Sequence, residues 1–286
     1  MNESSDRVRA DEESRRSHAE QSDEIEQIEQ VQEGLRLSAH QIYEVVRRDG
    51  VEEMTRPLVS LLFSGLAAGL LISVSLLGPA VLRAALPDTS WRPMVESLGY
   101  TLGFLLVIES RMQLFTENTI TTVLPLASRP RAEYFFLTGR LWGVVLMANV
   151  VGGLVAALFF AHSGAVSPEV QDAMRSISES AVLKAPLEGF VRAIPAGVLI
   201  AAIAWMLPTS PRNPFHIIVT FTWVIAAADF GHVVLGSVEM SYLSVLGELD
   251  VLQMVSFFFP ALLGNVVGGT LVFAIMAWAQ VVCEVE

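Results

Sequence analysis

The stretch Leu114-Phe115-Thr116-Glu117-Asn118-Thr119 is a polar interruption with apolar sequence on both sides. A second interruption, Asp229-Phe230-Gly231-His232, lies in the other half of the chain, and its histidine follows Thr116 by 116 residues. The same offset carries Ala148–Gly153 onto Gly264–Gly269, and both segments contain Asn-Val-Val-Gly-Gly. Two landmarks with one offset indicate an internal duplication, with one interruption in each copy.

The composition of the chain is that of a polytopic membrane protein. Of 286 residues, 52% are hydrophobic and 17% are charged, and the mean hydropathy is +0.52. Residues 1–38 hold eleven Asp and Glu against five Arg, and few large apolar residues. Such a segment cannot bury enough surface to offset its ordering entropy, so we expect 1–39 to be a disordered, acidic cytoplasmic tail. Residues 40–56 have apolar positions near helical spacing and predict an amphipathic helix on the membrane surface.

Several functional classes are excluded by residues that the chain lacks. Cys283 is the only cysteine, so an intrachain disulfide and a multi-cysteine metal site are excluded. Lys184 is the only lysine, and no glycine-rich phosphate loop precedes it. The sequence contains neither G-x-S-x-G nor H-E-x-x-H, so a hydrolase of either type is not expected. We therefore predict a protein that is not an enzyme and that has no cofactor and no metal.

The segment that contains the first interruption is too long for one straight membrane span and too short for two. Its uncharged pieces, 97–108 and 118–128, would rise roughly 18 and 17 Å as helices, which together match a hydrocarbon core of about 30 Å. We predict one crossing of two half-helices, broken near Gln113–Thr116. The fifth crossing repeats this pattern, with an uncharged run at 213–228, the second interruption, and a short apolar piece that ends near Glu239.

Six crossings are predicted in all, within a transport domain at 57–286. Each copy of the duplication contains three, and an odd number requires the two copies to insert with opposite orientations. The expected fold is an all-α polytopic membrane protein, an inverted 3+3 repeat of six transmembrane helices in which helices 2 and 5 are broken. Seven basic residues near the span ends on the side of the N-terminus, against four on the other, place both termini in the cytoplasm. The uninterrupted crossings are expected at 58–82, 141–161, 186–207 and 251–283.

These motifs also resemble the formate/nitrite transporter (FNT) family. The resemblance rests on Leu114–Thr119, Phe230–His232, Lys184 ahead of the fourth span, Arg192–Met206 on that span, and Gly264–Gly269. It covers about residues 40–282. It implies an aquaporin-like fold and a homopentamer in the lipid bilayer of a bacterial inner membrane. It further implies passage of small monovalent anions or their conjugate acids, with protons as a possible partner and no nucleic acid.

The chain departs from the family pattern at several positions. Met112-Gln113-Leu114 stands where the family often has Ala-Glu-Leu, and Glu117 stands where a small or neutral residue is common. Gly231 occupies a usual glutamate position, and Ala196-Gly197 replaces a frequent Cys-Asn. The chain therefore resembles a divergent branch with a long acidic N-terminal tail.

In the family the break threonine, the break histidine and the lysine before the fourth helix line the path, which implies these roles for Thr116, His232 and Lys184. Thr116 is expected to cap the first half-helix and still donate its hydroxyl to a ligand. Lys184 would concentrate anions and ease their protonation, while Leu114 and Phe115 would form an apolar gate. The predicted pore residues are Leu114, Phe115, Thr116, Asn118, Lys184, Phe230 and His232.

Two interpretations of His232 are open: it shares a proton with a weak-acid substrate, or it stays neutral and only donates a hydrogen bond. Thr116 as a simple cap and Lys184 as a surface lysine are plainer alternatives. Asn149 and Asn265, each followed by paired glycines, are expected to be helix-packing residues that bind neighbouring backbone.

Ionisable residues near the breaks are predicted to tune the electrostatics of the path. Glu109 and Arg111 are either functional or form a buried ion pair. An ionised Glu117 in an anion pore would repel its substrate, so we expect this residue to be neutralised by an arginine or to face away. With Asp229 these carboxylates leave an alternative function open, a proton-coupled transporter of another small carboxylate or solute. A scaffold that binds partners through its tail is a further alternative.

Overall fold

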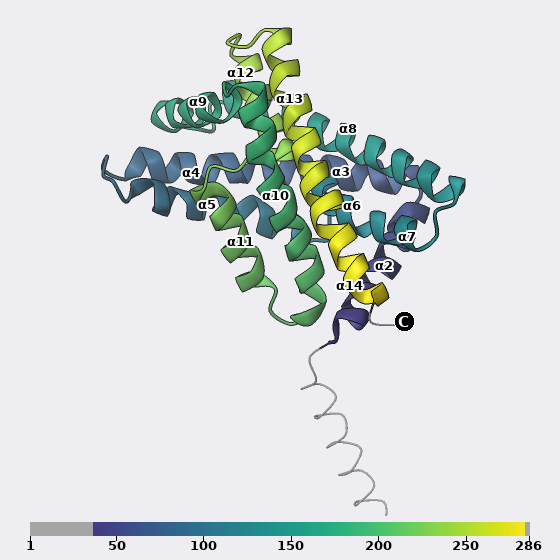
Figure 1. Ribbon diagram of the computed structural model, residues 1–286. Coiled ribbons are helices and arrows are strands. Elements are labelled where there is room, and N and C mark those ends of the chain that lie inside the picture. The colour runs from purple at the N-terminus through teal and green to yellow at the C-terminus, as the bar shows by residue number, and fades with distance from the viewer. Residues whose placement is uncertain (1–36, 284–286) are drawn as a thin grey trace, which may run out of the picture. The chain divides into compact units, whose positions relative to one another are not determined.

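The computed structural model describes residues 37–283, and the predicted tail at 1–39 lies almost wholly outside that range. Every regular element in the described range is helical. The first repeat begins after the preceding helix α2 and consists of two crossings and a broken one between them (Figure 1). The helix that precedes this repeat is α2 (Ala39–Thr55). The elements of the repeat are α3 (Leu58–Ile72), α4 (Val74–Ala85), α5 (Arg92–Glu109), α6 (Phe115–Thr121), α7 (Val123–Ser128) and α8 (Ala132–His162).

The second repeat follows the same order. A short helix, α9, precedes it, as α2 precedes the first. The elements are α9 (Pro168–Val182), α10 (Pro186–Met206) with the 3-10 turn η1 (Leu207–Thr209), α11 (Phe215–Ala227), α12 (Val233–Val245), α13 (Val251–Val266), the π-helical η2 (Val267–Ala274) and α14 (Ile275–Cys283).

Within residues 37–283, four crossings are long enough and apolar enough to span a membrane without a break. They are Leu58–Ala85, Ala132–His162, Pro186–Thr209 and Val251–Val281. The other two crossings are the broken pairs α5 with α6–α7, and α11 with α12. The six-crossing inverted repeat predicted from the sequence is therefore confirmed.

Both breaks are made in the same way. α5 ends at Glu109 and α11 at Ala227, and two residues later each chain turns through the left-handed region, at Arg111 (φ 51°) and Asp229 (φ 54°). A helix cannot continue through such a residue. The first break therefore lies at 110–114, slightly before the predicted Gln113–Thr116, and α12 continues to Val245, well past the predicted end near Glu239.

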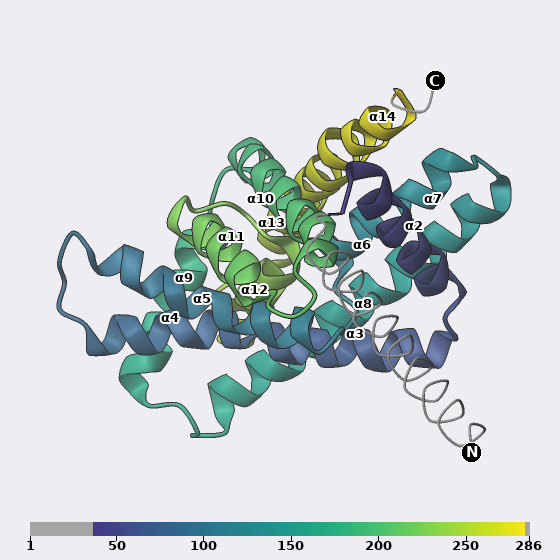
Figure 2. The same cartoon turned by 90° about the horizontal axis from the view of Figure 1, so that it is seen from below.

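The two half-helices that follow the breaks are exchanged between the repeats. α6 packs on α10 and η2 of the second repeat, and α12 packs on α8 of the first. In Figure 1 the helices α3, α4, α5 and α8 run across the view while α10, α11 and α13 cross them steeply, and α6 lies where the two sets meet. Figure 2 shows the same crossing from below. This exchange brings both breaks to the interface of the repeats.

Small residues let the long helices approach closely there. Gly69 on α3 would place an added Cβ only 2.1 Å from the backbone oxygen of Asn149 on α8. Gly197 on α10 would place one 2.3 Å from the backbone oxygen of Asn265 on α13. The Gly65-x-x-x-Gly69 motif thus serves close helix packing, and the second repeat reproduces the contact.

The predicted surface helix exists, but its apolar side faces protein. α2 buries Ile42, Tyr43, Val46 and Met54, mainly where it packs on α6, α7 and α8, and it leaves Val45 exposed. Glu53 on the same helix accepts a hydrogen bond from the hydroxyl of Thr121 at 2.7 Å. α2 is therefore docked on the end of the first broken crossing.

Candidate functional site

Two buried asparagines hold the two breaks in equivalent ways. Asn149 donates from Nδ2 to the backbone oxygens of Gly65 (2.8 Å) and Gln113 (2.9 Å), and its Oδ1 accepts from the N–H of Phe115 at 3.0 Å. In this way one side chain satisfies the backbone of the break and the first free N–H of the half-helix.

Asn265 repeats this pattern in the second repeat. It donates to the backbone oxygens of Ala193 (2.8 Å) and Gly231 (2.9 Å) and accepts from the N–H of Val233 at 2.8 Å. The expectation that both asparagines bind neighbouring backbone is confirmed. They pin a helix break, which is a more specific role than helix packing.

The structural register of the duplication differs from the one read from the sequence. Leu114 is the N-cap residue of α6, and His232 is the N-cap residue of α12, an offset of two residues more than the 116 that relates the asparagines. Arg111 and Asp229 share that larger offset. Thr116 therefore lies within the first turn of α6, and the prediction that it caps the half-helix is wrong.

Thr116 nevertheless meets His232. The Thr116 Oγ1 and His232 Nε2 atoms are 2.7 Å apart, and both side chains are buried. The other ring nitrogen, Nδ1, accepts the N–H of Leu235 at 3.2 Å and caps α12. Because an accepting nitrogen carries no proton, this geometry assigns the ring proton of a neutral His232 to Nε2, which donates to Thr116. The hydroxyl hydrogen of Thr116 is then left for another acceptor.

An aromatic ring of α5, that of Phe104, packs on this pair. Phe104 of α5 is fully buried and meets the His232 ring edge-on, with ring centroids 4.9 Å apart. Tyr100, one turn earlier, stacks on Phe104 at 5.2 Å. Aromatics at this spacing on an apolar helix also suit a lipid-facing surface, so the sequence carried no signal that these rings face the break.

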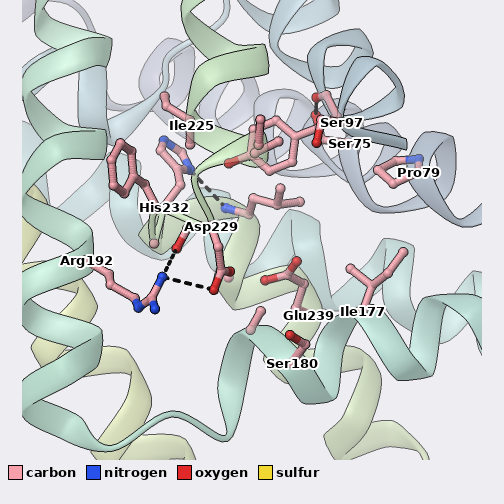
Figure 3. Close-up of a pocket in the computed structure, with 18 of the residues that line it drawn as sticks. Ser75, Pro79, Ser97, Ile177, Ser180, Arg192, Ile225, Asp229, His232 and Glu239 are labelled. Atoms are coloured by element: carbon pink, nitrogen blue, oxygen red, sulfur yellow. Dashed lines mark hydrogen bonds and ion pairs between the residues drawn. The ribbon is translucent and has the colours of Figure 1, made fainter. Parts of the chain in front are cut away.

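His232 lies at the inner end of a cavity of about 310 Å³. Four of the predicted site residues line it: Lys184, Asp229, Phe230 and His232. Figure 3 shows Asp229 and Arg192 beside the break and His232 beyond them. The rest of the wall comes from α4, α5, α9, α10, α11, α13 and one face of α12.

The charges at the cavity are tied to one another. Lys184 donates to the Asp229 carboxylate at 3.0 Å and to the backbone oxygen of Ser180 at 2.6 Å. Arg192 binds the other carboxylate oxygen of Asp229 at 3.2 Å and pairs with Glu188 at 2.8 Å. Lys184 therefore lies in the cavity wall and forms an ion pair with Asp229. It is neither an unpaired surface lysine nor an isolated positive charge that attracts anions.

The remaining predicted pore residues do not line the cavity. Leu114, Phe115 and Thr116 are buried at the start of α6, where the Phe115 ring packs edge-on against Trp142 with centroids 5.7 Å apart. Asn118 is also buried and donates to the Gln113 side chain at 3.1 Å. These residues form the far side of the break, beyond Thr116.

The three predicted charges near the first break are not paired with one another. Glu109 and Arg111 are exposed on this protomer, and no ion pair joins them among the described residues, so the buried Glu–Arg pair is not formed. Glu117 is half-buried and makes no hydrogen bond within the described range; the charges around it are those of Arg111, Glu53 and Asp49.

Comparison with known proteins agrees with this geometry. The family model described as formate/nitrite transporter matches residues 40–279. The chain belongs to the formate/nitrite transporter family. It is 39% identical to the inner membrane protein YfdC of Escherichia coli (strain K12), over 92% of this chain and 85% of that protein.

Two solved structures share the fold. A structure described as an FNT family ion channel matches with a TM-score of 0.74 at 16% identity, covering 84% of this chain and 98% of that one. A pentameric formate channel with formate bound matches with a TM-score of 0.67 at 17% identity, covering 79% and 98%. The aquaporin-like six-helix architecture is therefore that of FNT channels, and the chain is a membrane protein and not an enzyme.

Proposed function

We propose that the protein is a transmembrane channel or transporter for small monovalent anions of the formate and nitrite type. The observation that carries this proposal is the Thr116–His232 hydrogen bond at 2.7 Å. It joins two half-helices of an inverted repeat at the inner end of a cavity, where a solute could meet polar groups in an otherwise apolar core. The matching family and the formate-bound structure support the substrate class.

The path runs from the cavity past His232 and Thr116 to the side of Leu114 and Phe115. The Thr116 hydroxyl, which already accepts from His232, donates its own hydrogen to an oxygen of the passing solute. His232 stays neutral, because its Nδ1 is occupied by the N–H of Leu235 and a second proton would remove that cap. Leu114 and Phe115 form the apolar constriction beyond this pair.

An apolar constriction favours the neutral acid over the bare anion, so proton movement accompanies transport. The protein is a homopentamer in a bacterial inner membrane, with both termini in the cytoplasm. Residues 57–286 are the transport domain, 40–56 dock against its cytoplasmic end, and 1–39 form the acidic cytoplasmic tail.

A second candidate function, proton-coupled transport of another small carboxylate or solute, is favoured by the mixed charges of the cavity wall. Its wall includes Lys184, Arg192 and Arg83 as cations and Asp229, Glu96 and the α12 residue Glu239 as carboxylates. Such a balanced lining concentrates anions less than a purely basic one. It would also accommodate a solute that carries a hydrogen-bond donor.

The two candidates are separated by flux measurements on the full chain in proteoliposomes. Formate, nitrite, hydrosulfide and acetate are supplied in turn across a pH series, with His232→Asn as the variant. The first proposal predicts the fastest flux for the smallest anions and a strong loss in the variant. Preference for acetate would favour the second, and absence of any anion flux would refute both.

A further inference from the structure

One carboxyl group of the cavity wall, that of Glu239, has no part in the proposed path. Glu239 lies on α12 seven residues after His232, and Leu235 and Gly236 between them line the same cavity. This i, i+3, i+4, i+7 spacing places all four on one helix face. At 1.5 Å per residue, Glu239 lies about 10 Å farther along the axis of α12 than His232.

Glu239 is buried and has no partner. Only 8% of the residue is exposed, and it makes no hydrogen bond or ion pair within the described part of the chain. Figure 3 shows its carboxyl group pointing into the cavity between Asp229 and Ser180. Buried polar groups are nearly always hydrogen-bonded in native proteins, so an unpaired carboxyl in a cavity wall points to a ligand.

The cations nearby are already committed. Lys184 and Arg192 both bind Asp229, and Arg83 binds Glu96 at 2.7 Å. The charged groups that act on Glu239 are Lys184 and Asp229, and the Tyr100 hydroxyl of α5 faces the same space. The Glu239 carboxyl group is therefore free to bind a ligand, and among the described residues no cation forms an ion pair with it.

We propose that Glu239 binds the carboxylate of a weak monocarboxylic acid in this cavity, through a carboxyl–carboxylate hydrogen bond that shares one proton. The inference rests on the proposed function and deepens it. Two carboxyl groups at hydrogen-bond distance cannot both be ionised, so together they hold one proton. An anion of a strong acid, such as chloride or nitrate, cannot take part in this sharing and is not retained.

The shared proton also gives a route to the neutral acid. The O–H bond of Glu239 breaks and an O–H bond forms on the solute carboxylate, which leaves the neutral acid and the Glu239 carboxylate. The acid continues past His232 and Thr116. Glu239 then recovers a proton from water at the open end of the cavity, so one proton accompanies each solute molecule.

The test compares wild type, Glu239→Gln and Glu248→Gln in proteoliposomes at clamped membrane potential. Glu248 is the control, since its carboxylate pairs with the exposed Arg175 and does not line the cavity. Uptake of labelled formate, lumenal pH and nitrate uptake are measured together. Glu239→Gln should lose the proton that accompanies formate and should reduce the preference for formate over nitrate by about tenfold, the size of one charge-assisted hydrogen bond. Glu248→Gln should behave as wild type.

The outcomes separate this inference from the proposed function. If wild type moves formate with protons and Glu239→Gln does the same with unchanged selectivity, the inference is overturned and the proposed function stands. If wild type moves no anion, both are overturned. Glu239→Asp, which keeps a carboxyl group, should retain proton movement, and its failure to do so in a correctly assembled protein would also contradict the inference.

Discussion

Leu114 and His232 occupy the same position in the two repeats, each as the N-cap residue of a half-helix that follows a left-handed turn. Only His232 supplies a side-chain cap, by accepting the N–H of Leu235. At the first break the Leu114 side chain has no atom that could accept a hydrogen bond. The polar side chain here is that of Thr116, in the first turn of α6, and it contacts His232. The site is thus asymmetric within a symmetric frame, with both polar groups from the two breaks meeting at one bond.

The hydrogen bonds of Asn149 and Asn265 should contribute most of the stability of the two breaks. Asn265→Ala leaves the N–H of Val233 and the carbonyls of Ala193 and Gly231 without their partner. The free energy of unfolding should fall by about 3 kcal/mol, since buried unsatisfied groups cost about 1–3 kcal/mol each. Thermal unfolding in detergent measures this loss, with Asn213→Ala at an exposed position as the control. Equal unfolding midpoints for the two variants would contradict the role of Asn265 in holding the break.

Two glycines of α10, Gly197 and Gly189, provide a test of close helix packing and its control. Gly197→Ala on α10 sets a Cβ against the Asn265 backbone oxygen at 2.3 Å, while Gly189→Ala on the same helix meets nothing within 4 Å. Backbone cannot yield to such a contact cheaply, so Gly197→Ala should lower the yield and the unfolding midpoint of the protein. Gly189→Ala should leave both unchanged. If the two variants unfold alike, α10 and α13 do not pack as described.

The ion pair of Lys184 should restrain the attraction of anions to the cavity. Asp229→Asn removes that partner and leaves Arg192 paired with Glu188. The freed ammonium group should raise the initial rate of formate uptake at low salt by about threefold, and the gain should fade as salt screens it. Glu248→Gln, which breaks an exposed pair with Arg175, is the control. A slower or salt-independent rate in Asp229→Asn would count against this role.

Docking of α2 should depend on pH through Glu53. Burial raises the pKa of this carboxyl above its ordinary 4.5, although Thr121 and Gln113 donate to it. A raised pKa in the folded state means that the contribution to stability is complete below pH 4.5 and is lost as the pH rises through the folded-state pKa. Glu53→Gln should therefore gain stability relative to wild type between acid and neutral pH. If the difference between the unfolding midpoints of Glu53→Gln and wild type does not change with pH, Glu53 does not make the docking of α2 depend on pH.

Much of the architecture could be predicted because it depends on local features of the sequence. The two interruptions, the repeated Asn-Val-Val-Gly-Gly segments and the uncharged runs indicate six crossings with two breaks. The register of the breaks could not be predicted, because the similar polar residues Thr116 and His232 suggest one alignment while the backbone places Leu114 opposite His232.

The cavity wall could not be predicted in the same way. The sequence predicts that an apolar piece ends near Glu239, but α12 continues to Val245 and this residue lines the cavity. Phe104 reaches His232 only because α12 is exchanged into the opposite repeat. Such contacts depend on tertiary packing, and no periodicity within one segment encodes them.

The contact between Thr116 and His232 is tested most directly by a double-mutant cycle on formate flux in proteoliposomes. Thr116→Val and His232→Asn should each lower the flux about tenfold, and the double variant should be no slower than either, because both remove one interaction. Thr116→Ser, which keeps the hydroxyl, should retain most of the flux. Losses that simply add, or flux indifferent to both substitutions, would contradict a conduction path through this bond.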